Sequence, residues 1–261
     1  MDPQVIEKVV QEMSNFSPDM GELQGVTLLQ GICDIWDTIY NFQARDGDIV
    51  VASYPKSALE VADSMPSPRI LKTHLPVQLV PPSFWEKDVK VVYVARNPKD
   101  CMVSYYYFHK MDQTMADPGN WEDFFSNFMS GKVTWGDWFD HVIGWWKAKD
   151  HHKILYIFYE DMIEDPRREI LKVMKFLGKD FPEDVVQKIL QHTSFKSMKN
   201  NPVVNFSCLP ESVFDQSVTS FMRKGTVGDW KNHFLDSQNL IFDEEYKKKM
   251  AGSGLDFRTE L

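Results

Sequence analysis

The segment Lys90-Val-Val-Tyr-Val-Ala95 constrains the fold most, because it is apolar along nearly its whole length. A strand without a polar face is typical of the centre of a parallel sheet, where helices cover both faces. Arg96-Asn-Pro-Lys-Asp100 follows directly and leads into a helical stretch over residues 101–111. Pro98 suits the first turn of that helix, where its missing N–H is not needed. The sequence therefore predicts a strand–turn–helix unit here.

Three further short apolar runs predict strands over residues 49–52, 69–74 and 153–159, and helical patterns lie between and after them. The expected helices cover residues 119–129, 138–149, 165–177, 182–192 and 243–250, and Asp165 and Pro166 are expected as N-cap and first residue of the third. Residues 200–222 show no regular pattern and predict a long loop. Strands that alternate with helices favour an α/β fold, with a central parallel sheet flanked by helices. We expect one domain over residues 1–261, loosely ordered over residues 1–25.

Composition excludes several classes of protein. The 261 residues carry a formal charge of -9, which gives no general attraction to nucleic acid or to anionic membranes. Neither a signal peptide nor an apolar run long enough to span a bilayer is present, so we expect a cytosolic protein. Its three isolated cysteines predict reduced thiols and no metal site.

Basic and hydroxyl residues gather where the predicted strands end. Ligands of open α/β sheets bind at the carboxyl ends of the strands. The residues at these ends are Lys56 and Ser57, Lys72 and His74, Arg96 with Ser104 on the helix behind it, and Tyr159. Such a cluster in an acidic protein predicts a P-loop-like site for a polyanionic ligand. Arg223, Lys224 and Gly225 are expected to close over the ligand as a basic loop.

His74 and Arg96 each admit a structural interpretation as well. A lone histidine is more often structural than catalytic, and Arg96 could be a surface residue beside a helical Ser104. The period of a strand puts Lys72 and His74 on one face, where a base beside a cation suits deprotonation of an acceptor hydroxyl. The helix N-terminus beside Arg96 favours anion binding.

The chain resembles the cytosolic sulfotransferases from about residue 24 to its end. The motifs that carry the resemblance are Tyr54-Pro-Lys-Ser57, Lys72-Thr-His-Leu-Pro76, Ala95-Arg-Asn-Pro-Lys-Asp100 with Ser104-Tyr-Tyr, Phe158-Tyr-Glu-Asp-Met162 and Phe221-Met-Arg-Lys-Gly225. These motifs stand in the same order as in the family. Taken together, they are similar to those of the branch that acts on phenols and amines.

The resemblance implies transfer of a sulfuryl group from 3'-phosphoadenosine 5'-phosphosulfate (PAPS) to a hydroxyl or amine of a small aromatic or lipophilic acceptor, without a metal. By motif, His74 would be the base, Lys56 would contact the 5'-phosphosulfate and Lys72 would assist. The implied contacts of the nucleotide are Lys56, Ser57, Arg96, Ser104, Tyr159, Thr193, Arg223, Lys224 and Gly225. The implied lining of the acceptor pocket is Phe108, Phe139 and Phe206.

The chain departs from the family pattern in two places. Family members continue Gly-Thr-Thr-Trp after Tyr-Pro-Lys-Ser, whereas here Ser57 is followed directly by Ala58-Leu-Glu. Several tens of residues are expected to be missing there, including donors for the phosphosulfate, so a form that binds nucleotide without turnover is the alternative hypothesis. A misfolded product without function is the third hypothesis. The family's dimer motif keeps only Lys231, so a homodimer through that patch is not expected.

Overall fold

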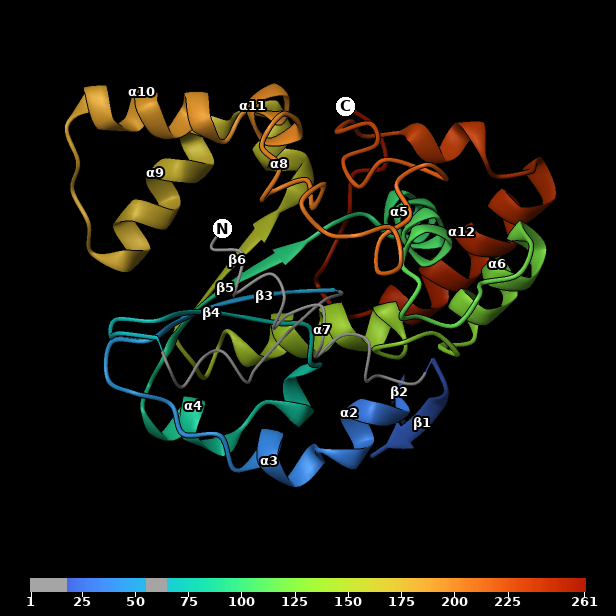
Figure 1. Ribbon diagram of the computed structural model, residues 1–261, viewed down its shortest axis with the longest axis horizontal. Helices are drawn as coiled ribbons and strands as arrows, with labels where there is room; N and C mark the ends of the chain where they lie inside the picture. Colours follow the sequence, from blue (N-terminus) through green and yellow to red (C-terminus); the bar gives the residue numbers. More distant parts are fainter. Residues whose placement is uncertain (1–17, 55–64) are drawn as a thin grey trace.

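A four-stranded parallel sheet lies at the centre of the protein (Figure 1). The computed structural model describes residues 18–54 and 65–261. The strands are β3 (Ile49–Ser53), β4 (Ile70–Thr73), β5 (Lys90–Ala95) and β6 (Ile154–Phe158), in the order β4-β3-β5-β6 with every neighbouring pair parallel. All four strands predicted from the sequence are confirmed, as is the α/β fold.

Helices cover the sheet and gather beyond the carboxyl ends of its strands (Figure 1). α4 (Pro82–Glu86) and α7 (Trp138–Ala148) lie along one side of the sheet, and α5 (Pro98–Met111), α6 (Trp121–Met129) and α12 (Asp236–Met250) form a group at the end of β5. The helices α8 (Tyr159–Glu164), α9 (Pro166–Leu177), α10 (Glu183–His192) and α11 (Phe195–Lys199) follow β6. The carboxyl ends of the strands therefore face α5 and the loop before α12.

Local sequence signals set several helix ends. Asp165 accepts a hydrogen bond from the Arg168 N–H as the N-cap of α9, and Pro166 is its first residue, as predicted. α12 begins earlier than the predicted residue 243, because the Gln238 side chain accepts from the Leu235 N–H and closes the first turn. Among the described residues, five short helices were not predicted: α2 (Gln30–Asp34), α3 (Trp36–Tyr40), α4, α8 and α11.

An antiparallel hairpin of β1 (Met20–Leu23) and β2 (Val26–Leu29) is an exception to the loose order expected over residues 1–25. Its turn residues Gln24 and Gly25 both have positive φ, at 50° and 78°. A two-residue turn of that kind matches the twist of the paired strands, and a glycine in it is the usual signal.

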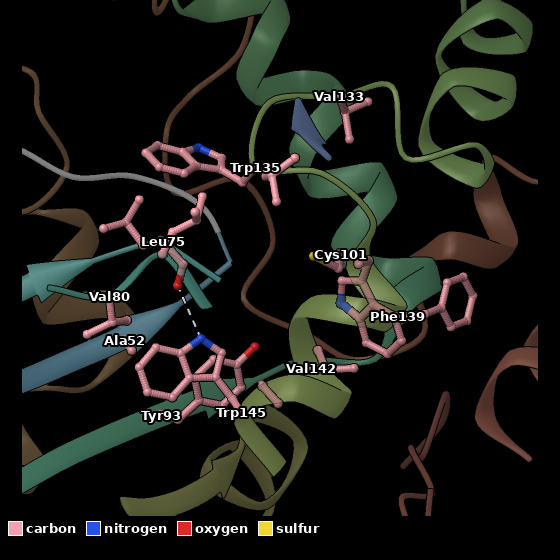
Figure 2. Close-up of a cluster of buried hydrophobic side chains, with 14 of the residues drawn as sticks. Ala52, Leu75, Val80, Tyr93, Cys101, Val133, Trp135, Phe139, Val142 and Trp145 are labelled. Carbon is pink, nitrogen blue, oxygen red and sulfur yellow. Dashed lines mark hydrogen bonds between the residues drawn. The ribbon is translucent and has the colours of Figure 1, made fainter. Parts of the chain in front are cut away.

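The main core lies between the sheet and α7, and is rich in aromatic side chains. Figure 2 shows Tyr93 of β5 beside Trp145 and Val142 of α7. The ring centroids of Tyr93 and Trp145 are 5.3 Å apart in a stacked arrangement. A second, smaller cluster is built on Met111, Val213 and Phe214, where the loop over residues 200–222 packs against the end of α5. That loop is thereby held close to the site described next.

Candidate active site

A cavity of about 230 Å³ opens at the carboxyl ends of the strands, between α5 and the loop that precedes α12. Five residues predicted from the sequence line it: Lys72, Arg96, Ser104, Phe108 and Arg223. They come from β4, from the end of β5, from α5 and from the loop near residue 223. Three of these five residues are cations, in a protein whose net charge is -9.

Arg96 leaves β5 at the start of the turn that opens α5. Its guanidinium carbon lies 4.5 Å from the centroid of the Tyr159 ring, and its Nη2 donates to the Thr226 carbonyl oxygen over 3.3 Å. Burial is the main cause that raises the pKa of Tyr159. The two residues expected to share a ligand therefore contact each other, although only Arg96 lines the cavity.

The first turn of α5 is tied to distant parts of the chain through Asn97 and Asp100. The Asn97 side chain accepts from the Asp100 N–H as the N-cap, and its amide donates to Glu160 Oε1 over 2.8 Å. Asp100 is 1% exposed and accepts from the backbone N–H groups of Gly228, over 2.8 Å, and of Trp230, over 3.0 Å. The carboxylate of Asp100 thus holds the loop over residues 222–230 against α5.

That loop presents Arg223 to the cavity. Arg223 pairs with the buried carboxylate of Asp229 over 2.5 Å, and its guanidinium carbon lies 4.8 Å from the centroid of the Tyr107 ring. Burial opposes ionisation of Asp229, but its bonds with Asn232 and Arg223 hold its pKa below the usual range. The guanidinium of Arg223 is therefore held by the ionised carboxylate of Asp229 and by the ring of Tyr107.

The structure places Lys224, Gly225 and Thr193 outside the lining of the cavity. Lys224 is exposed. Gly225 has φ +69°, and a Cβ atom there would lie 2.2 Å from the Phe195 ring, so this position accepts only glycine and packs against α11. Thr193 is exposed at the end of α10, where its hydroxyl donates to the Ile189 carbonyl.

Lys72 and His74 differ in exposure, although the strand period predicts that they share a face. Lys72 is exposed to the cavity, and partial desolvation lowers the pKa of its ammonium. His74 follows the last residue of β4 and is fully buried. Its Nδ1 lies 2.5 Å from the Ser53 carbonyl oxygen, and its ring contacts Trp135 edge-on at 5.6 Å. His74 does not line the cavity.

Two of the three phenylalanines expected around an acceptor do not line the cavity. Phe139 is 1% exposed and packs in the main core, against Phe242 and Tyr246. Phe206, with φ 58°, packs in the smaller cluster on Phe221, a cavity residue, at 4.7 Å between ring centroids. Phe139 does not face the cavity, because it lies on the side of α7 that is buried in the core.

Lys56 and Ser57 lie outside the described residues. The described parts of the chain hold no group of three or more His, Cys, Asp or Glu side chains placed to bind a metal. Over residues 18–54 and 65–261, no helix is long and apolar enough to cross a bilayer.

Sequence reasoning missed eight residues of the cavity wall: Tyr54, Cys101, Tyr105, Tyr107, Met111, Thr219, Ser220 and Phe221. The helical period could have found part of this set, because Cys101, Ser104, Phe108 and Met111 recur along one face of α5. Burial raises the pKa of the Cys101 thiol to about 12, so this cysteine is a packing residue and not a nucleophile.

Comparisons with known proteins agree on one family. Residues 7–254 match the family model described as "Sulfotransferase domain". The rat protein named "Sulfotransferase 1C2" is 48% identical over 282 aligned positions, which take in 92% of this chain and 95% of that protein. The rat "Sulfotransferase 1 family member D1" is 44% identical, over 94% of this chain and 98% of that protein.

Solved structures extend the likeness to the fold. Mouse sulfotransferase SULT7A1, complexed with PAP, superimposes with a TM-score of 0.76 at 30% identity, over 90% of this chain and 96% of that one. A retinol dehydratase in a complex with retinol and PAP gives a TM-score of 0.81 at 22% identity, over 99% and 97% of the two chains, and supports the fold alone.

Proposed function

The chain belongs to the cytosolic sulfotransferase family and is a sulfotransferase that uses PAPS, and on that premise we propose how its residues bind the donor and move the sulfuryl group. The observation that carries the proposal is the meeting of Lys72, Arg96 and Arg223 in one cavity of an acidic protein. Such a cluster suits a ligand with several phosphate or sulfate groups.

Arg96, Ser104 and Arg223 form the proposed subsite for the 3'-phosphate of the nucleotide. Arg96 lines the cavity from the turn before α5 and Arg223 lines it from the loop over residues 222–230. Ser104 lines the same cavity from α5, where it is exposed. A guanidinium can bind a phosphate with two parallel hydrogen bonds, and both guanidiniums already rest on aromatic rings. Lys224 and Gly225 belong to this subsite through the loop, and Tyr159 and Thr193 are proposed beside the adenine.

The transfer step is proposed at the β4 end of the cavity. The acceptor oxygen or nitrogen forms a bond to sulfur while the bond from sulfur to the bridging phosphate oxygen breaks. The acceptor proton passes to His74, and desulfated nucleotide (PAP) and sulfated product leave. We propose that Lys72 stabilises the negative charge that develops. The same role is proposed by motif for Lys56, which lies outside the described residues. Since His74 is buried, the role proposed for it requires that the acceptor displace the groups over its ring.

The acceptor is proposed to be a small aromatic or lipophilic molecule. Phe108 and Phe221 line the cavity with Tyr107 and Met111, which adds apolar surface to the cavity that holds the cations. Their ring centroids lie 6.4 Å apart with the planes nearly perpendicular. Phe206 supports Phe221 from the loop, whereas Phe139 is too deep in the core to contact an acceptor without repacking.

A nucleotide-binding form without turnover is the second candidate, and the length of the alignment favours it. The alignment with the rat relative extends over 282 positions, more than the 261 residues of this chain. The alignment therefore holds positions that have no counterpart in this chain, and we propose that they fall after Ser57, where the family continues Gly-Thr-Thr-Trp. The subsite on α5 and the loop over residues 222–230 does not depend on that segment, whereas placement of the sulfuryl group would.

Transfer of labelled sulfate from PAPS to a simple phenol separates the two candidates. We expect the unmodified chain to turn over and His74→Ala to lose about 100-fold or more in kcat, because a general base supplies that much. His151→Ala, a change of an exposed histidine, is the matched control and should keep full activity. A folded chain that binds PAP but shows no transfer would favour the second candidate, and one that neither binds nor transfers would overturn both.

A further inference from the structure

Two ring N–H groups of α7, one helical turn apart, contact the backbone that follows β4. His141 Nε2 lies 2.9 Å from the His74 carbonyl oxygen. Trp145 Nε1 donates to the next carbonyl, that of Leu75, over 3.2 Å, as the dashed line in Figure 2 shows. Both α7 side chains are at most 1% exposed. The segment that carries His74 is therefore fastened to α7 at two successive peptide groups.

The hydrogen-bond partners of the His141 ring, the His74 carbonyl and the Tyr93 hydroxyl, show which of its nitrogens carries the proton. The Tyr93 hydroxyl lies 2.8 Å from His141 Nδ1, and burial raises the pKa of Tyr93 well above its usual value, so it keeps its proton. Burial also lowers the pKa of His141 to about 4, so the imidazole is neutral near pH 7 and has one N–H. A carbonyl oxygen can only accept. The N–H is therefore on Nε2, toward His74, and Nδ1 accepts from Tyr93.

We propose that His141 is a positioning residue for the reaction: through its hydrogen bond to the His74 backbone it fixes the place of the His74 ring. The proposal rests on the role given to His74 above. On its other side, the His74 ring contacts the Ser53 carbonyl at the end of β3. The residue is thus held between β3 and α7, and a displacement of about 1 Å at a reacting group can cost roughly 100-fold in rate.

The same contacts admit a purely structural interpretation, in which His141 only satisfies a buried carbonyl. Trp145 offers a control in the same helix, because Trp145→Phe removes the N–H to Leu75 and keeps a smaller aromatic ring beside Tyr93. A structural role predicts that loss of either bond lowers activity only as far as it lowers the folded fraction. A positioning role predicts a loss of kcat that is specific to the bond on His74.

Steady-state kinetics with PAPS and a phenol, beside calorimetry with PAP, test the proposal on the full chain. His141→Leu should lower kcat about 100-fold and leave the dissociation constant of PAP within about twofold. His141→Gln should recover kcat to within about tenfold of the parent, since its amide nitrogen reaches the position of Nε2. Trp145→Phe should keep kcat within about threefold. Equal losses in His141→Leu and Trp145→Phe, or no recovery in His141→Gln, would overturn the proposal.

Nitrogen-15 spectra of the histidine rings give a result even if the chain shows no turnover. We expect His141 to show a single N–H on Nε2 from pH 7.5 down to 5.5, and the His74 ring signals to move in His141→Leu but not in Trp145→Phe. If the His74 signals do not move in His141→Leu, or if Nδ1 of His141 carries the proton, the proposal is contradicted. Neither result would contradict the proposed nucleotide subsite.

Discussion

The two walls of the cavity are built in different ways. The α5 wall is fixed by an N-cap and a buried carboxylate within its own first turn, where Asp100 also ties down the loop over residues 222–230. The β4 wall presents Lys72, and the buried His74 two residues further on is held by α7, whose His141 lies 67 residues along the chain from His74. Under the function proposed above, nucleotide binding and placement of the sulfuryl group therefore depend on separate sets of contacts, and one can fail without the other.

Removal of the Asp100 carboxylate should disrupt the α5 wall most. Asp100→Ala leaves the partly buried N–H of Gly228 and the buried N–H of Trp230 without this acceptor. Each buried donor left without a partner costs about 1–3 kcal/mol, so we expect the free energy of unfolding to fall by about 3 kcal/mol. Because Arg223 moves with the loop, the affinity for PAP should also fall.

Urea unfolding and calorimetry measure both effects. Asp184→Ala, which changes an exposed carboxylate on α10, should alter neither the free energy of unfolding nor PAP binding. If Asp100→Ala changes the free energy of unfolding by less than about 1 kcal/mol and keeps parental affinity, the carboxylate does not hold this wall.

A fall in pH should destabilise the contacts of α7 with the end of β4, by less than Asp100→Ala destabilises the α5 wall. Burial holds the pKa of His141 at about 4, against about 6.5 for an unfolded histidine. Between these values the unfolded chain binds a proton that the folded chain excludes, so stability falls as the pH falls. Between pH 7.5 and pH 5.5, protonation of this one residue in the unfolded chain should lower the free energy of unfolding by about 1.4 kcal/mol.

Urea unfolding of the parent and of His141→Gln at both pH values isolates that share from the contribution of other groups. The variant should lose about 1.4 kcal/mol less than the parent over this interval. His151→Gln, with its exposed side chain, should follow the parent. An equal loss in the parent and in His141→Gln would mean that His141 is not held neutral by the fold.

The strands and most helices were predictable because their signals are local. β5 shows its apolar run, and Asp165 and Pro166 mark the start of α9. The residues that position the site were harder to predict, because their partners are distant: Asp100 meets Gly228, and His141 meets Tyr93 and His74. The motifs named Arg96 and Arg223 but not the ion pair with Asp229 that fixes Arg223. The family resemblance assigned Phe139 to the acceptor pocket, and the sequence of its helix alone does not reveal that this residue is buried in the core.

The most direct test of the central claim is calorimetry of the unmodified chain with PAP and with 5'-AMP, which lacks the 3'-phosphate. The account predicts that PAP binds at least about tenfold more tightly, and that Arg223→Gln removes this preference while it leaves the affinity for 5'-AMP unchanged. Equal affinity for the two nucleotides in the folded, unmodified chain would contradict the claim that Arg96, Ser104 and Arg223 form a 3'-phosphate subsite.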